Sequence, residues 1–347
     1  MKQSIKNISI LIIYTGGTIG MIKNPDNGSL IPLNFENIFN QLPELQHFPY
    51  NISAISFEPP VDSSEVNPVF WKDLIDIIEA HYDKYDGFIV LHGTDTMAYS
   101  ASALSFMIEN PKKPVIFTGS QLPLGSLRTD GKENLISSVE IAAAKKENKP
   151  VVPEVCIYFE NKLFRGNRTT KHNAEYFNAF RSDNCPPLAE TGIHINFNHQ
   201  HILSPEHEKE TVFHKTMNTD IGILYIFPGI NKQTVDSILH TENIKAVILA
   251  SYGEGNTPSD EWFINSIEEA IKRGILVLNI SQCKAGSINM GKYVSSMKLK
   301  KIGVLSGHDM TLESGITKLM FLLGSGKDKD EIRQGLNRSI KGEIKII

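Results

Sequence analysis

Residues 87–109, GFIVLHGTDTMAYSASALSFMIE, decide the fold. The first five residues, Gly87–Leu91, have the length and apolar composition of a strand that is buried on both faces. A helix of mostly small and apolar residues is predicted over Met97–Glu109, and the polar residues His92–Thr96 lie between the two elements. A strand that leads directly into a helix is half of a βαβ unit, and this arrangement predicts a parallel sheet.

The same alternation of strand and helix extends through most of the chain. Further strands are predicted at residues 8–14, 114–118, 155–159, 221–227, 246–250, 275–280 and 302–305. Further helices are predicted at residues 68–82, 133–146, 259–273 and 311–323. We therefore predict the α/β class, with a larger N-terminal domain built on a mostly parallel sheet flanked by helices and a smaller C-terminal α/β domain.

The segment of residues 186–218 interrupts this alternation. It contains Pro186-Pro187 and the histidine-rich run HINFNHQHILSPEHEKE, and it has no long apolar stretch. We expect a linker here, between an N-terminal domain over residues 1–185 and a C-terminal domain over residues 219–347. The spacing of the histidines matches no known metal motif, so solvated linker histidines are expected rather than a metal site.

Composition argues against several kinds of protein. The chain has 347 residues, of which 41% are hydrophobic, and this is enough for one large or two medium domains. Its net charge is −4, from 39 acidic and 35 basic residues, so no nucleic-acid partner is expected. Three widely spaced cysteines argue against a disulfide framework and fit a reducing compartment.

The N-terminus imitates a signal peptide, because Lys2 and Lys6 precede an apolar run that ends at Tyr14. The run has only the length of a strand, and no cleavage motif of small residues follows it. No stretch of the sequence approaches the ~20 apolar residues of a membrane span. We therefore expect a cytoplasmic protein that does not associate with a membrane.

Polar clusters follow four of the predicted strands, at the positions where open parallel sheets bind ligands. They are TGGT at residues 15–18, HGTDT at 92–96, TGSQ at 118–121 and SYGEGN at 251–256. The first cluster is not a dinucleotide fingerprint, which would need glycine at position 15, and it is not a P-loop, because no Gly-Lys-Ser/Thr follows. It places the hydroxyls of Thr15 and Thr18 beside flexible glycine backbone.

Three further residue groups offer chemistry, and each has a structural alternative. Thr94 and Asp95 can cap the following helix, or they can bind an ammonium group and position a water. Lys171, in FRGNRTTKHN, is a solvated lysine or, if it is desolvated beside a threonine hydroxyl, a base. Asp62 and Ser63, in PPVDSSEVNP, cap a helix or receive a carboxylate. No metal motif is present, so hydrolysis by a threonine nucleophile without metal or cofactor is open.

Seven motifs carry a family resemblance. They are YTGGTIG (14–20), LHGTDTMAYSASALSFM (91–107), PVIFTGSQLPL (114–124), RTDGKENL (128–135), FRGNRTTK (164–171), SYGEGN (251–256) and SQCKAGSINMGKY (281–293). In their order and spacing they resemble the bacterial-type L-asparaginases, and among these the cytoplasmic type I group. The resemblance covers nearly the whole chain. It implies hydrolysis of L-asparagine to L-aspartate and ammonia, often with weaker glutaminase activity, by a homodimer or homotetramer that needs no cofactor.

The resemblance also implies the catalytic groups. Thr15 would be the nucleophile, and Thr94, Asp95 and Lys171 would form a second catalytic group in which Lys171 polarises Thr94. Thr15 would form an acyl-enzyme that water then hydrolyses, although direct attack by water stays open.

Binding roles follow from the same resemblance. Asp95 would also hold the α-amino group of the substrate, and Ser63 with Asp62 would hold its α-carboxylate. Backbone N–H groups near Gly93 and Thr94 would hold the amide oxygen.

The sequence departs from the family pattern at two points. Many members carry an activating tyrosine in the lid that follows the nucleophile, but the segment Met21–Pro32 has none. Tyr293 is either its substitute or a structural aromatic. Some type I enzymes also bind asparagine at a separate effector site through an arginine just before the SYG motif, where this chain has Ala250. This argues against that form of cooperativity, although Thr170 and Cys283 stand where companion residues are expected.

Two other interpretations compete with an asparaginase. The amidase component of tRNA-dependent amidotransferases resembles this chain but carries an extra N-terminal domain, whereas Thr15 lies near the start here. The other interpretation is a non-catalytic module that binds an amino acid or a nucleotide. The joint presence of Thr15, Thr94, Asp95 and Lys171 argues against it.

Overall fold

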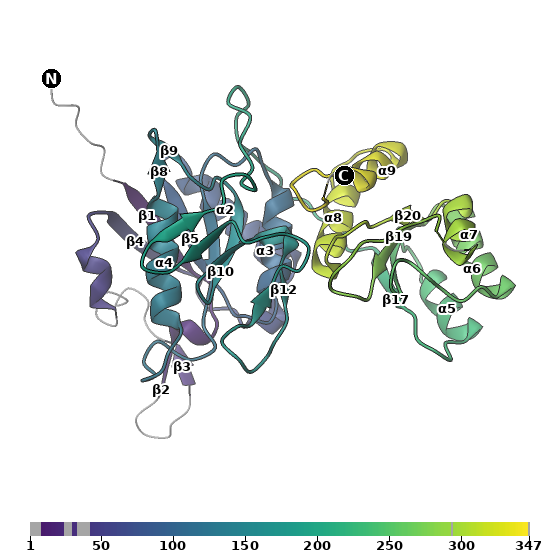
Figure 1. The fold of residues 1–347 in the computed structure, drawn as a ribbon, viewed down its shortest axis with the longest axis horizontal. Helices are drawn as coiled ribbons and strands as arrows, with labels where there is room; N and C mark the ends of the chain where they lie inside the picture. The colour runs from purple at the N-terminus through teal and green to yellow at the C-terminus, as the bar shows by residue number, and fades with distance from the viewer. Residues whose placement is uncertain (1–7, 24–29, 33–41, 293, 346–347) are drawn as a thin grey trace. The chain divides into compact units, whose positions relative to one another are not determined.

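The computed structural model describes residues 8–23, 30–32, 42–292 and 294–345, and Figure 1 shows their fold. The chain divides into two compact units. One consists of Met1–Ser182 and Pro186–Lys215, and the other consists of Asp183–Cys185 and Thr216–Ile347. Among the described residues, no helix has the length and apolar character to span a membrane.

The first unit is built on an eight-stranded sheet in the order β15-β14-β11-β10-β7-β5-β1-β4. Five neighbouring strands are parallel: β4 (Asn51–Ser56), β1 (Ser9–Tyr14), β5 (Gly87–Leu91), β7 (Val115–Thr118) and β10 (Val155–Phe159). Three antiparallel strands extend the sheet: β11 (Lys162–Arg165), β14 (Ala189–Thr191) and β15 (Ile195–Phe197). The predicted, mostly parallel sheet is therefore confirmed.

Helices cover both faces of this sheet. Alternate residues of β1 and β5 pack in one cluster with apolar residues of α4 (Gly131–Ala143), as the period of two along a strand requires. On the other face lie α2 (Pro68–His81) and α3 (Met97–Met107). There Tyr82, the C-cap of α2, stacks on Phe88 of β5 with ring centroids 5.8 Å apart. The central strands are thus buried on both faces, which explains their continuous apolar sequences.

Short elements complete the first unit. The two-stranded pairs are β2 (Met21–Lys23) with β3 (Leu30–Pro32), β6 (Ile108–Glu109) with β16 (Val212–Phe213), β8 (Lys145–Lys146) with β9 (Lys149–Pro150), and β12 (Thr170–Lys171) with β13 (Phe180–Arg181). The 3₁₀ turns are η1 (Thr18–Gly20), η3 (Pro43–His47), η4 (Ser63–Glu65) and η5 (Gly166–Arg168). The predicted helix over residues 97–109 ends early, at Met107, because Ile108–Glu109 pairs with β16.

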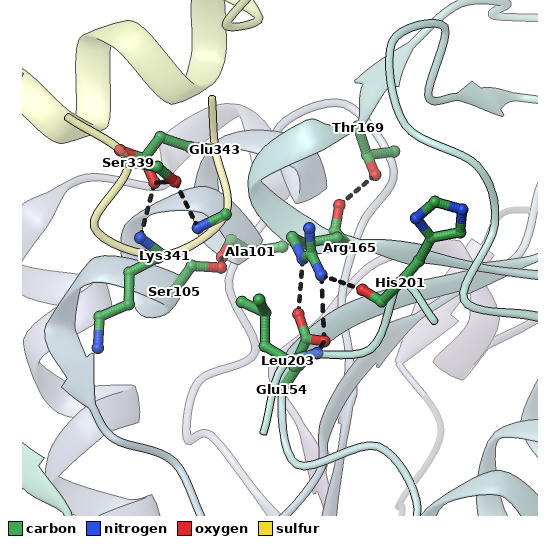
Figure 2. A network of polar contacts seen from close by, with 11 residues as sticks. Ala101, Ser105, Glu154, Arg165, Thr169, His201, Leu203, Ser339, Lys341 and Glu343 are labelled. Carbon is green, nitrogen blue, oxygen red and sulfur yellow. Dashed lines mark hydrogen bonds and ion pairs between the residues drawn. The ribbon is translucent and has the colours of Figure 1, made fainter. Parts of the chain in front are cut away.

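The expected linker over residues 186–218 is wrong for most of its length, because residues 186–215 belong to the first unit. Two strands of the large sheet, β14 and β15, lie in it. The histidine-rich part of this segment is bound to a buried ion pair of the first unit, in which Arg165 Nε lies 2.6 Å from Glu154 Oε2. As Figure 2 shows, Arg165 also donates to the carbonyl of His201 (2.6 Å), and Glu154 accepts from the backbone N–H of Leu203 (2.6 Å). Strands of three residues are too short to show a period, so the sequence pattern did not reveal them.

The second unit has a parallel four-stranded sheet in the order β17-β18-β19-β20. Its strands are β17 (Ile221–Tyr225), β18 (Ala246–Ser251), β19 (Leu276–Ser281) and β20 (Leu305–Ser306), and its helices are α5 (Lys232–Leu239), α6 (Glu261–Lys272), α7 (Val294–Ile302), α8 (Leu312–Gly324) and α9 (Lys329–Asn337). The smaller C-terminal α/β unit is therefore also confirmed. The strand predicted over 302–305 differs, because α7 continues to Ile302 and the strand begins at Leu305.

A fully buried ion pair holds the C-terminal segment to this second unit. Lys318 Nζ in α8 lies 2.6 Å from Glu343 Oε1, and both side chains are 0% exposed. Glu343 also accepts from the backbone N–H groups of Ile340 and Lys341, and Figure 2 shows its contact with Lys341. Burying both charges is tolerated because each has hydrogen-bond partners besides the other.

Candidate active site

The loops that follow β1 and β5 meet at the carboxyl edge of the sheet. Tyr14 and Leu91 are register partners at the ends of these strands, and the backbone N–H of Thr15 donates to the carbonyl of Leu91 at 2.9 Å. A Cβ atom on Gly17 would lie 2.5 Å from the Cα atom of Gly93, and the φ of Gly17 is +88°. Only glycine permits this approach and this conformation, so Gly17 allows the Thr15 loop to lie against the HGTDT loop.

A third loop, which contains Asp62 and Ser63, packs on the same spot. A Cβ atom on Gly93 would lie 2.5 Å from Ser63 Oγ, and Thr96 Oγ1 donates to the carbonyl of Ser63 at 2.6 Å. The carboxylate of Asp62 turns back on its own loop and accepts from the backbone N–H and the hydroxyl of Ser64, both at 2.8 Å. These two hydrogen bonds lower the pKa of Asp62, and the one from the backbone N–H has the larger effect. Asp62 therefore shapes this loop as a charged cap.

Lys171 in β12 contacts both polar side chains of the HGTDT loop. Its Nζ lies 2.8 Å from Thr94 Oγ1 and 2.6 Å from Asp95 Oδ1. The side chain of Lys171 is only 17% exposed, whereas that of Asp95 is 68% exposed. The structure thus brings together three sequence-predicted residues, two of which lie 77 positions apart. The solvated-lysine alternative does not describe Lys171.

The helix-capping alternative for Thr94 and Asp95 also does not match the structure. The N-cap of α3 is Thr96, and its side chain makes no capping hydrogen bond. Asp95 instead pairs with Lys171 through Oδ1. Its exposed carboxylate is therefore available to a cationic ligand.

Gln121 is a neighbour of Thr94 that we did not single out from the sequence. The hydroxyl of Thr94 accepts from Lys171 and donates to Gln121 Oε1 at 3.3 Å. The backbone N–H of Gln121 donates to both carboxylate oxygens of Asp130, at 3.1 and 3.0 Å, and its Nε2 donates to the carbonyl of Tyr176. The only sequence signal was the position of TGSQ after the neighbouring strand β7.

Thr15 itself is held by backbone. Its side chain is almost fully buried, with the residue 2% exposed, and its hydroxyl donates to the carbonyl of Leu91 at 3.0 Å. Its own carbonyl accepts from the backbone N–H of Val61 at 2.7 Å. Thr15 is therefore anchored on both sides, by the strand ends and by the loop that leads to Asp62.

Two predictions lie partly or wholly beyond this description. Tyr293 is outside the described residues. Of the predicted lid, the structure describes only Met21–Lys23 and Leu30–Pro32, which pair as antiparallel strands. In the described ranges, no group of three or more histidine, cysteine or acidic side chains is placed to hold a metal ion.

Comparisons with known proteins agree with this architecture. Residues 9–203 match the family described as "Asparaginase, N-terminal", and residues 220–336 match "Glutaminase/Asparaginase C-terminal domain". The chain is 44% identical to L-asparaginase 1 of Escherichia coli over 338 residues, which cover 97% of this chain and 98% of that protein. It is also 29% identical to the L-asparaginase of Thermococcus kodakarensis, over 97% of this chain and 99% of that one.

Among solved structures, the crystal structure of L-asparaginase I from Vibrio cholerae matches with a TM-score of 0.89 and 39% identity, over 98% of this chain and 100% of that one.

Proposed function

The chain belongs to the asparaginase family, and from this premise we propose that it hydrolyses L-asparagine to L-aspartate and ammonia, with weaker activity on L-glutamine. The observation that carries the proposal is the contact of Lys171 with Thr94 and Asp95, on a loop that lies against Gly17, two residues after Thr15. We further propose that the enzyme acts in the cytoplasm as a homodimer or homotetramer. No cofactor is needed for this reaction, because water is the only co-reactant.

Charge supports the assignment of the substrate groups. L-asparagine carries an α-ammonium and an α-carboxylate, and a site for it must offer one group to each. Asp95 has an exposed carboxylate of which one oxygen already faces Lys171, and the other oxygen would accept from the α-ammonium. The hydroxyl of Ser63 would donate to the α-carboxylate, while Asp62 holds the loop in shape through Ser64.

The nucleophile in this proposal is Thr15. Its Oγ1 forms a bond to the amide carbon of the substrate, and the C–N bond of the amide then breaks, with the nitrogen leaving as ammonia. The proton that Thr15 loses is the one that the leaving nitrogen must gain. Water then attacks the resulting ester, which releases L-aspartate and restores the Thr15 hydroxyl.

Thr94 and Lys171 would serve the proton transfers. The ammonium group of Lys171 stabilises negative charge on Thr94 Oγ1, because the two lie 2.8 Å apart in a partly buried setting. A water held by Thr94 would thereby become a better nucleophile for the ester. The backbone N–H of Thr94 would donate to the amide oxygen as negative charge develops there.

The experiment measures ammonia release from L-asparagine and L-glutamine over a concentration series, with purified protein and no added metal or nucleotide. Thr15→Ala and Thr94→Val should each lower kcat by on the order of 10³-fold or more, because each removes a group that acts on the reacting atoms. Thr241→Val is the control: this threonine is exposed in the second unit and its hydroxyl donates to the Ser237 carbonyl, so loss of the hydroxyl should leave kcat unchanged.

Two results would contradict the proposal. Near-normal turnover in Thr15→Ala or Thr94→Val would remove that residue from its role. No ammonia from either amide would refute the activity itself.

The curve of rate against L-asparagine concentration should be hyperbolic, because Ala250 replaces the arginine of the effector site.

A further inference from the structure

His92 is a buried side chain that the mechanism above does not use. It follows the last residue of β5 and precedes Gly93, and it is 1% exposed. Its Nδ1 lies 2.6 Å from the carbonyl oxygen of Gly93, and its Nε2 lies 2.9 Å from Ser100 Oγ in α3. Ser100 Oγ in turn lies 3.0 Å from Trp71 Nε1 in α2. The four residues form one chain of hydrogen bonds from helix α2 to the site loop.

Chemistry fixes the direction of every bond in this chain. A carbonyl oxygen only accepts, so His92 Nδ1 carries the proton and donates to Gly93. The indole N–H of Trp71 only donates, so Ser100 Oγ accepts from it. Burial lowers the pKa of His92 to about 4, so the ring is neutral near pH 7 and its Nε2 accepts the hydroxyl proton of Ser100. All donors therefore point from Trp71 towards the Gly93 carbonyl.

Fixing the Gly93 carbonyl fixes the N–H of Thr94. Both groups belong to one planar peptide, and among the described residues the only cis bond is Glu58-Pro59, so they point in opposite directions. Position 93 must be glycine, because a Cβ atom there would lie 2.6 Å from Ser63 Cβ. Glycine by itself gives this peptide plane more rotational freedom than any other residue would. The bond from His92 restrains the orientation of its carbonyl, in addition to the packing of Gly93 against Gly17 and Ser63.

The N–H of Thr94 is available to a ligand. Within the part of the chain that the structure describes, it makes no backbone hydrogen bond, whereas the N–H of His92 is used in the sheet by the carbonyl of Thr118. A donor that will meet developing negative charge has to be aimed before the reaction, because its value depends on costing no reorganisation at that moment.

We propose that His92 is a positioning residue, whose Nδ1–H bond to the Gly93 carbonyl aims the backbone N–H of Thr94 at the amide oxygen of the substrate. This inference rests on the proposed function. It assigns to His92 an effect on the transition state and not on substrate affinity, so that kcat and not KM depends on it.

Two variants separate this role from a merely structural one. In His92→Asn, the side-chain N–H₂ lies near the position of Nδ1 and can still donate to Gly93, but Ser100 loses its acceptor. In His92→Gln, the side-chain amide lies near the position of Nε2 and can still serve Ser100, but the donor to Gly93 is lost. Ser100→Ala is the matched control, because it cuts the chain on the side away from Gly93.

The expected result is a kcat of His92→Gln about 10²-fold below the wild type, as for loss of one oxyanion donor, with KM nearly unchanged. His92→Asn should retain at least about ten times more of the wild-type kcat than His92→Gln does. Ser100→Ala should lower the melting temperature while leaving kcat close to the wild-type value, because it leaves the indole N–H of Trp71 buried without an acceptor.

The inference is overturned if His92→Asn loses as much kcat as His92→Gln, or if the loss of kcat follows the loss of melting temperature across all three variants. If neither His92 variant folds, ring ¹⁵N spectra of the wild type decide, because a proton on Nε2 instead of Nδ1 would also overturn it. Failure of the proposed function is a separate outcome, since then the wild type itself releases no ammonia.

Discussion

The burial of His92 predicts how the unfolding free energy changes at acid pH, and this prediction does not depend on catalysis. Its pKa is about 4 in the folded protein, because burial disfavours the imidazolium, and near 6.5 in the unfolded chain. Between these values the unfolded chain binds a proton that the folded protein does not bind. The folded state is therefore destabilised as the pH falls through this window, and the effect is absent above it.

The size of the effect follows from the two pKa values. The difference between 6.5 and about 4 corresponds to about 3 kcal/mol of unfolding free energy, reached near pH 4, with about 2 kcal/mol already lost at about pH 5. His92→Gln has no group to titrate here and should escape this loss. The unfolding free energy of the wild type minus that of His92→Gln should thus fall by about 3 kcal/mol between about pH 7 and pH 4.

The assay can be confined to the unit that contains His92. The chain has two tryptophans, Trp71 in the first unit and Trp262 in the second. In a Trp262→Phe background, fluorescence reports on Trp71, which lies in the same hydrogen-bond chain as His92. Urea unfolding followed at several pH values gives the two free energies. A difference that stays constant over this pH range would refute the buried, neutral state of His92.

Three further predictions concern other contacts. Lys171→Met should lower kcat by about 10²–10⁴-fold at an unchanged melting temperature, because it removes the cation beside Thr94 and keeps the apolar stem of the side chain. Steady-state kinetics and calorimetry measure the two quantities, and a near-normal kcat would contradict the prediction. Gly93→Ala should lower kcat/KM on the order of 10²-fold, because the new Cβ atom displaces the Ser63 loop, and unchanged kinetics would show that the loops yield freely. Lys318→Met should destabilise the second unit by about 3–5 kcal/mol, because Glu343 is left buried without its cation, and denaturant unfolding with Trp262 as the probe would expose a smaller cost.

The parts of the fold that were predictable from sequence are the parts that are buried on both faces. The strands predicted at residues 87–91 and 155–159 match β5 and β10 residue for residue, because each is a continuous apolar run between polar residues. β4, by contrast, is only partly buried and its sequence NISAIS mixes polar and apolar residues. The linker prediction failed for a related reason: β14 and β15 are held by sheet pairing and by the Arg165–Glu154 pair, which are contacts between distant residues.

The site shows the same division. Short motifs identify Thr94, Asp95 and Lys171, and the structure brings these three side chains into contact. The acceptor of the Thr94 hydroxyl, Gln121, lies 27 positions away, and no local pattern indicates which way an amide side chain will point. The hydrogen-bond chain through His92 was also hidden, because it depends on how α2 and α3 pack over the end of β5.

The two threonines of the site differ in how ready they are to react. Thr94 already has the cation of Lys171 at its oxygen and an acceptor for its proton. The Thr15 hydroxyl donates a hydrogen bond to the Leu91 carbonyl, which is an acceptor but not a base, so as the proposed nucleophile it would have to leave this bond before it attacks. The adjacent Tyr14 does not solve the problem, because burial raises its pKa to about 12 and its hydroxyl donates to the carbonyl of Gly20. In the proposed mechanism, activation of Thr15 therefore requires a rotation of its side chain away from Leu91, and we expect a substrate whose amide carbon lies beside Oγ1 to favour this rotation.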